Sequence, residues 1–107
     1  MQISMYNRVE AYLDFFKFPL KNYFEKVMVS KDFVRQKRAE YIRKWINRVY
    51  RIENIEIVSQ TKDKITIKVL YYWEISSLHQ RLNGESQLLM NIVQQNGKFK
   101  IISIQQL

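Results

Sequence analysis

Apolar and polar residues alternate along the second half of the chain, from Ile65 to Leu107. A period of two residues is typical of strands that bury one face. Both glycines of the protein lie in this stretch, in the pairs Asn83-Gly84 and Asn96-Gly97. Because Asn-Gly between apolar runs is a strong signal for a two-residue hairpin turn, the pattern predicts an antiparallel meander that turns at 83–84 and at 96–97.

The two turns also predict which residues face each other across the strands. About the turn at 96–97, the partners are Gln95 with Lys98, Ile92 with Ile101 and Met90 with Ser103. About the turn at 83–84, they are His79 with Leu88, Ile75 with Ile92 and Trp73 with Gln94.

One face of the predicted sheet is apolar and needs covering helices. It carries Ile65, Ile67, Val69, Tyr71, Trp73, Ile75, Leu88, Met90, Ile92, Phe99 and Ile101. The other face mixes Thr66, Lys68, Tyr72, Glu74, Asn91 and Lys100 with Leu70, Leu89, Ile102 and Ile104. Since this outer face is more apolar than a lone domain usually exposes, we expect a homodimer that forms through it.

The beginning of the chain follows a helical period. Apolar residues recur at spacings of three and four over residues 4–17, where Ser4 can cap a helix that Pro19 stops near Phe18. Residues 22–28 are short and rich in residues that favour strands, so they predict an edge strand.

A second helix is predicted from its cap at Ser30 to about Asn47, with Asp32 in the first turn. A strand over Ile52 to Ser59 and a turn at Gln60-Thr61-Lys62-Asp63 follow and lead into the meander. The apolar stripe of this helix consists of Val34, Tyr41, Ile42, Trp45 and Val49, with Phe33 and Ile46 at its margins.

Arg38 falls near the middle of that stripe at about 100° per residue. An unpaired buried charge is very costly, so the guanidinium must be compensated. Either it pairs with a glutamate on the sheet or reaches water, or it binds an anion at the floor of a pocket.

The composition predicts one domain over residues 1–107, either complete or cut from a larger protein. Its charge is uneven, because residues 17–51 hold eleven Lys or Arg against Glu25, Asp32 and Glu40, and this surplus equals the whole net charge of +8. A basic segment of this kind is either a solvated helix face or a patch for an anionic partner.

Several classes of site are disfavoured. The chain has no cysteine and one histidine, so we expect no metal site, and no cofactor motif is present. No apolar run reaches the ~18 residues of a membrane span, and nucleic-acid-binding signatures are absent. The acid and base candidates Asp14, Glu74 and His79 fall away from the core or at its rim, so we expect no catalytic residues.

The order helix, strand, helix and four antiparallel strands resembles the NTF2-like superfamily, which includes SnoaL-like and cystatin-like cones. A narrower resemblance, in residues 23–50, is to accessory NTF2-like domains of secreted bacterial proteins that carry peptidase-like or cell-wall modules. It rests on Tyr23-Phe24-Glu25-Lys26, Ser30, Arg38, Tyr41, Trp45, Arg48 and Tyr50. The chain departs from that pattern at Arg38, Glu25 and Ile46, where the pattern has Lys, Gly and Pro.

The resemblance implies an α+β fold in which helices pack on a strongly bent antiparallel sheet around a pocket, and an extracytoplasmic location. We expect a non-catalytic accessory domain that binds a small anionic or peptidoglycan-like ligand, or another domain of the parent protein. The alternatives are a small enzyme of the isomerase or cyclase type and a basic-patch nucleic-acid-binding domain. The predicted ligand-binding residues are Tyr12, Phe16, Arg38, Tyr41, Trp45, Tyr71, Trp73 and Met90.

Overall fold

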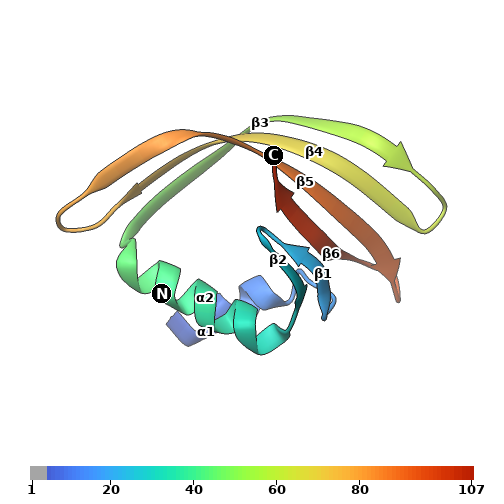
Figure 1. Cartoon of the computed structure of the whole chain (residues 1–107), viewed down its shortest axis with the longest axis horizontal. Coiled ribbons are helices and arrows are strands. Elements are labelled where there is room, and N and C mark those ends of the chain that lie inside the picture. Colours follow the sequence, from blue (N-terminus) through green and yellow to red (C-terminus); the bar gives the residue numbers. More distant parts are fainter. Residues whose placement is uncertain (1–4) are drawn as a thin grey trace.

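The computed structural model of the protein describes residues 5–107 (Figure 1). In chain order its elements are α1 (Met5–Leu13), β1 (Leu20–Tyr23), β2 (Lys26–Val29), α2 (Lys31–Lys44), β3 (Asn47–Gln60), β4 (Lys64–Ser76), β5 (Arg81–Gln95) and β6 (Lys98–Gln106). The strands form one six-stranded sheet in the order β2-β1-β6-β5-β4-β3, in which β1 and β6 run parallel and the other neighbours antiparallel.

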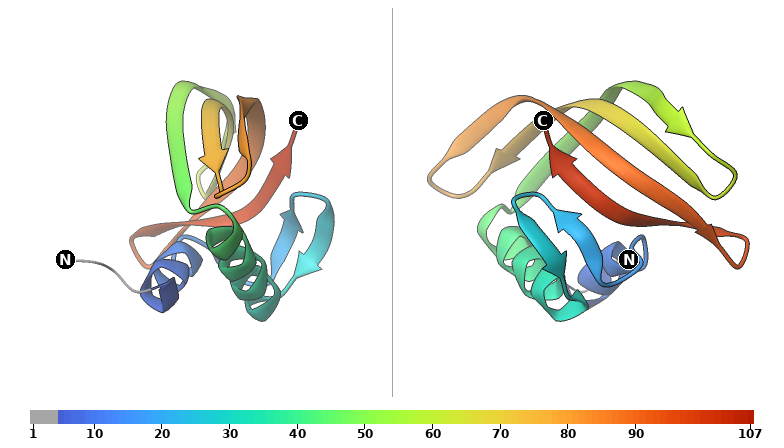
Figure 2. Two further views of the ribbon diagram at one scale, coloured as in Figure 1. Left: turned by 90° about the vertical axis from the view of Figure 1, so that its left-hand side faces the viewer. Right: turned by 45° about the vertical axis from the view of Figure 1, so that its right-hand side comes forward.

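The sheet is strongly bent. Strands β3, β4 and β5 form an arch whose concave side faces α2, and α1 and α2 lie beneath it beside the β1–β2 hairpin (Figures 1 and 2). The buried core lies where the helices meet β1 and β6, and it consists of Val9, Leu13, Phe16, Leu20, Tyr23, Val29, Val34 and Ile104. The predicted α+β class, with helices packed on a bent sheet, is therefore confirmed.

The N-terminal predictions need correction. Helix α1 ends at Leu13 instead of residue 17, because the chain after it pairs with β6: the Ile101 amide donates to the Phe15 carbonyl at 2.8 Å, and the Lys17 amide donates to the Ile101 carbonyl at 2.9 Å. Ser4, the expected cap, lies outside the described residues. The edge strand expected over 22–28 is instead the β1–β2 hairpin, whose turn follows Tyr23.

The second helix begins as predicted, since the Phe33 amide donates to the Ser30 hydroxyl at 3.2 Å. It ends at Lys44 instead of Asn47, because Trp45 adopts an extended conformation while its amide still donates to the Tyr41 carbonyl. Strand β3 therefore starts earlier than expected, and Val49 lies exposed on that strand instead of on the helix stripe.

The hairpin at 96–97 is present. Asn96 and Gly97 both have positive φ, at 52° and 76°, and the predicted pairs Gln95 with Lys98 and Ile92 with Ile101 form. Beyond them a bulge shifts the register, so that Met90 faces Ile104 instead of Ser103. Because an extra residue reverses the faces that follow it, Ile104 lies in the core and not on the outer face as predicted.

The hairpin predicted at 83–84 is wrong. Strands β4 and β5 are joined at residues 77–80, where the Ser77 amide donates to the Gln80 carbonyl at 2.8 Å. Gly84 lies inside β5 opposite Trp73, and a β-carbon on it would stand 2.9 Å from Trp73 Cζ2. The glycine is required here because the indole lies against the strand, and no turn forms.

The side chains of β4 and β5 lie on the predicted faces of the sheet in spite of this register error. Ile75 pairs with Leu82 and not with Ile92, a shift of ten residues along β5. Because side chains alternate with a period of two, an even shift leaves every residue on its predicted face. The inner pairs are Ile65 with Ile92, Ile67 with Met90 and Val69 with Leu88. On the outer face Leu70, Tyr72, Leu89 and Ile102 are half-buried.

Candidate functional site

Arg38 lies on α2 between two aromatic rings. Its guanidinium carbon stands 4.3 Å from the ring centre of Tyr12 and 5.3 Å from that of Tyr41. The buried Nε atom has no hydrogen-bond partner among the described side chains, those of residues 8–107, or the backbone of residues 5–107. No carboxylate of those residues forms an ion pair with Arg38, so the glutamate that could have compensated it is not found there.

The tyrosines around Arg38 are neutral at physiological pH. Burial raises the pKa of Tyr12 well above its ordinary value, with a further increase from Tyr23, and Arg38 offsets only part of it. Burial likewise raises the pKa of Tyr41, as does its hydrogen bond with Tyr50. No tyrosinate therefore supplies a negative charge for the guanidinium.

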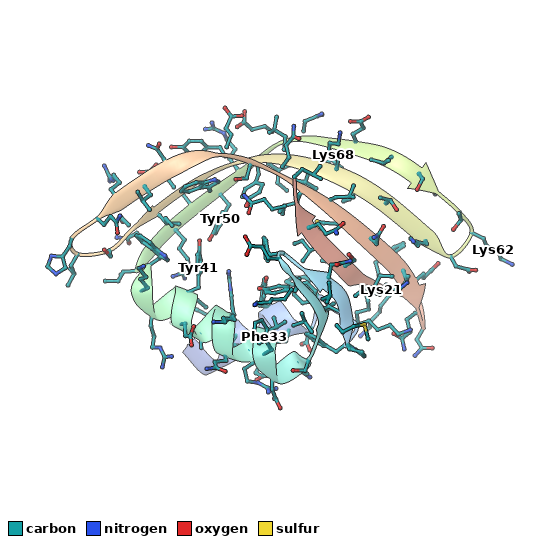
Figure 3. All side chains as sticks on the ribbon, viewed as in Figure 1. Lys21, Phe33, Tyr41, Tyr50, Lys62 and Lys68 are labelled. Atoms are coloured by element: carbon teal, nitrogen blue, oxygen red, sulfur yellow. The ribbon has the colours of Figure 1, made fainter. Side chains whose placement is uncertain are left out.

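A hollow of about 190 Å³ lies between α2 and the concave face of the sheet. Tyr41 and Tyr50 point toward each other beneath the arch (Figure 3), and their hydroxyls form a hydrogen bond. The Trp73 indole donates from Nε1 to the Ser86 hydroxyl at 3.0 Å. The complete lining is Tyr41, Tyr50, Tyr71, Trp73, Ile75, Ser86 and Gln106.

A second hollow, of about 360 Å³, lies at the other end of α2 and shares Gln106 with the first. It is lined by Tyr23, Phe24, Glu25, Lys26, Phe33, Lys37 and Gln106. Tyr12 reaches it through the hydrogen bond between its hydroxyl and that of Tyr23, at 3.0 Å. We refer to the two hollows together as the α2 groove. Arg38 lines neither hollow and lies on the helix between Lys37 of the second and Tyr41 of the first.

The expected site residues divide into two groups. Tyr41, Tyr71 and Trp73 line the α2 groove, and Tyr12 and Arg38 stack next to it. The other three do not line it: Phe16 is buried in the core with its ring 5.1 Å from that of Tyr12, Trp45 is buried at the end of α2, and Met90 packs against the core.

The predicted site omits four lining residues of the first hollow, Tyr50, Ile75, Ser86 and Gln106, and all six residues that line only the second. Tyr50 falls on the inner face by its two-residue spacing from Ile52, and a strand prediction that began at residue 47 would have found it. Ser86 and Gln106 gave no signal, because their positions depend on the true register of β5 and β6.

The acid and base candidates lie outside the groove. Asp14 is exposed just after α1, and His79 is exposed in the β4–β5 turn. Glu74 is on the outer face, where it pairs with Arg81 at 3.5 Å and lies 3.4 Å from the Tyr72 hydroxyl.

The basic segment concentrates along α2, which carries Lys31, Arg35, Lys37, Arg38, Arg43 and Lys44. Some of this charge is engaged: Arg35 bonds Glu10 at 2.8 Å and also Asp32, and Lys37 lies 3.7 Å from Glu40. The helix nevertheless borders the groove with a surplus of positive charge, which favours an anionic occupant.

A hollow larger than these two lies elsewhere. It measures about 460 Å³ and is bordered by Lys17, Pro19, Lys21, Val93 and Ile102, away from Arg38. Its cations are exposed lysines, and none of them is buried like the Arg38 Nε.

Neither described helix is long and apolar enough to cross a membrane.

Solved structures share this architecture. A proposed aromatic ring hydroxylase from Novosphingobium aromaticivorans superposes with a TM-score of 0.80 at 10% identity, over 94% of this chain and 74% of that one. The association domain of CaMKII from C. elegans superposes with a TM-score of 0.71 at 8% identity, over 92% of this chain and 79% of that one. A Nostoc punctiforme protein of unknown function with a cystatin-like fold superposes with a TM-score of 0.69 at 20% identity, over 92% of this chain and 74% of that one.

The fold is an NTF2-like cone. No family model and no curated protein matches the sequence. At these identities the likeness establishes the NTF2-like fold alone, since this fold hosts many unrelated functions. The functions printed for the neighbours differ accordingly, from hydroxylase to association domain.

Proposed function

We propose that this NTF2-like domain is a non-catalytic binding domain whose α2 groove takes a small ligand with a carboxylate, and that Arg38 binds that carboxylate. The observation that carries the proposal is the partly buried guanidinium, whose Nε has no hydrogen-bond partner and which pairs with no carboxylate among the side chains of residues 8–107. A planar guanidinium can donate two parallel hydrogen bonds to a carboxylate, which suits it to this role.

The energetics support a missing anion. Stacking on Tyr12 and Tyr41 stabilises a cation by about 0.5–2 kcal/mol, whereas leaving a buried charge without a counter-charge costs several kcal/mol. The two rings therefore hold Arg38 in place but do not fully compensate it. An anion in the groove would supply the remaining compensation for the positive charge of Arg38.

The lining supports a ligand that is partly apolar. Tyr71 and Trp73 offer flat aromatic surfaces, and Ser86 and Gln106 offer hydrogen bonds. Cell-wall peptides combine apolar side chains, amides and carboxylates, and the resemblance in residues 23–50 points to the same ligand class. We therefore propose a peptidoglycan-derived peptide as the ligand, and an extracytoplasmic location for the domain.

A catalytic role is the main alternative, since one structural neighbour is a proposed hydroxylase. Enzymes with this fold need an acid or base within reach of the substrate. Asp14, Glu74 and His79 lie outside the groove, and Glu25, the carboxylate that lines its second hollow, is exposed to solvent, which favours binding over catalysis. The nucleic-acid alternative is disfavoured because both tryptophans and the tyrosines at 12, 23, 41, 50 and 71 face the core or the groove. The sequence predicts a homodimer through the outer sheet face or a partner domain covering it, but the apolar residues of that face are half-buried, which favours it less as an interface than the exposed edge strand β3.

The proposal is tested with Arg38→Met, which keeps length but removes the charge. Because a desolvation penalty disappears, the free energy of unfolding should stay the same or rise. Affinity for a muropeptide should fall by about 1.5–3 kcal/mol, the usual value of a charge-assisted hydrogen bond. Urea denaturation and isothermal titration calorimetry measure the two quantities.

Two controls separate a specific contact from a general charge effect. Arg43→Met removes a charge from an exposed position of the same helix and should leave affinity almost unchanged. A muropeptide whose carboxylates are amidated should bind the native protein and Arg38→Met equally. Equal binding of the unmodified muropeptide by both proteins, at unchanged stability, would contradict the proposal.

A further inference from the structure

The edge strand β3 exposes an unusual amount of apolar surface. Every residue from Val49 to Gln60 is exposed, and six of them are large and apolar. Their exposed fractions are 55% for Val49, 46% for Tyr50, 63% for Ile52, 54% for Ile55, 60% for Ile57 and 52% for Val58. The apolar residues of the outer sheet face are half-buried by comparison, so β3 exposes more apolar surface than that face does.

The position of β3 leaves one side of its backbone open. It is the last strand in the sheet order and pairs only with β4, at the side of the arch away from β6 (Figure 2). A long edge strand with unpaired backbone groups is a template on which another strand can pair.

The sequence of β3 is complementary to itself. If two copies pair antiparallel about a two-fold axis between Glu53 and Asn54, Arg51 of each copy faces Glu56 of the other. In the same register Ile52 faces Ile55, Tyr50 faces Ile57 and Val49 faces Val58. The central pairs, Glu53 with Asn54, are polar. On either side of them lie apolar pairs and an attractive charged pair, the two kinds of cross-strand pair that stabilise a sheet.

This register also respects the faces of the sheet. Tyr50, Ile52, Ile55 and Ile57 face inward with their β4 partners, and Arg51 and Glu56 face outward. Inner residues therefore meet inner residues, and outer meet outer. A register shifted by two residues instead puts Val49 opposite Glu56 and Ile52 opposite Glu53. It loses the charged pairs and keeps Tyr50 with Ile55 as an apolar pair.

We propose that two copies of this chain associate edge to edge through β3, in the register that pairs Arg51 with Glu56, and form one continuous twelve-stranded sheet, twice the six strands of one copy. The contact would place Ile57 of the second copy beside Tyr50, at the rim of the α2 groove. Each groove would then be extended by the other copy.

Charges and bulges on an edge strand also occur where a protein avoids pairing, and β3 has irregularities near Glu53 and Val58. An edge strand that avoids pairing, however, repels a second copy of itself, usually through lysines. Here the opposite charges Arg51 and Glu56 lie symmetrically about the centre of the strand, so the edge attracts its own copy.

The test is a charge swap read out by sedimentation velocity over a range of protein concentrations. The native protein should sediment as a dimer of the 13.1 kDa chain. Arg51→Glu and Glu56→Arg, taken singly, each set like charges opposite one another twice per dimer, and each should raise the dissociation constant by about tenfold or more. The double variant Arg51→Glu/Glu56→Arg should restore the native value, because the attraction is re-formed with its signs reversed.

Two further variants locate the contact. Leu89 lies on the outer face, so Leu89→Glu should leave the dimer unchanged. Loss of the dimer in this variant would assign the contact to the outer face and overturn the proposal. The protein has no cysteine, so Ile52→Cys/Ile55→Cys should give a covalent dimer on oxidation. A monomer at every concentration, or a double charge variant no tighter than the single ones, would also overturn it. Thermal unfolding checks that each variant is folded.

Discussion

Gly84→Ala should destabilise the domain although it adds only a methyl group. The new carbon would stand 2.9 Å from Trp73 Cζ2 and 3.2 Å from Cε2, both atoms of a rigid ring. Since carbon atoms in contact lie about 3.5 Å apart or more, the indole must move by roughly 0.6 Å. That movement pulls Nε1 away from the Ser86 hydroxyl, to which it now donates at 3.0 Å.

The net cost follows from three contributions. Overpacking costs about 1–3 kcal/mol, and the weakened indole hydrogen bond about 1 kcal/mol. Replacing a glycine inside a strand returns about 0.5–1 kcal/mol. The variant should therefore lose about 2 kcal/mol, which for a domain of this size lowers the melting temperature by roughly 10 °C.

The cause can be isolated with a double-mutant cycle. Trp73→Phe removes the colliding atoms, so Gly84→Ala should cost almost nothing in that background, with a coupling energy of about 2 kcal/mol. Gly97→Ala is the matched control, because a β-carbon there meets open space and its cost comes from a φ of 76°. Circular dichroism during urea denaturation measures all five proteins. A Gly84→Ala variant as stable as the native protein would refute the contact with Trp73.

Two other outcomes are expected. Trp45, 7% exposed at the end of α2, should lose about 3–5 kcal/mol of stability when changed to Ala, as large core aromatics do; a loss below about 1 kcal/mol in urea denaturation would show that it is not part of the core. Stability should be full below about pH 10 and fall above it, because burial raises the pKa of Tyr12 and Tyr23 in the folded state while the unfolded chain releases these protons near pH 10. Tyr12→Phe should reduce this alkaline loss, and an identical loss in that variant would contradict the assignment.

The two Asn-Gly pairs mark what local sequence could and could not predict. At Asn96-Gly97 the pattern was correct, because two residues with positive φ connect adjacent strands. At Asn83-Gly84 the same dipeptide serves a contact with a residue eleven positions earlier, which no local pattern reveals. The inner face was predicted correctly despite this error, because strand faces depend only on whether a shift is odd or even.

The candidate site was predicted where it depends on one helix and missed where it depends on several strands. Helical spacing placed Arg38 beside Tyr41, and both lie together in the structure. Trp45 was assigned to the site because its helix was expected to continue, but the chain turns into β3 there. Ser86 and Gln106 reach the groove through strand register, which depends on a bulge and on a long hairpin.

The paired tyrosine hydroxyls give the groove a reversible polarity. In the pairs Tyr12 with Tyr23 and Tyr41 with Tyr50, either oxygen can be the donor, because a phenol both donates and accepts. Rotating the two O–H bonds of a pair exchanges the roles without moving a heavy atom. These tyrosines can therefore meet an amide in either orientation and do not select between its ends. Arg38 can only donate, as can Lys26 and Lys37 of the second hollow, so discrimination by charge rests on these cations and not on the tyrosines.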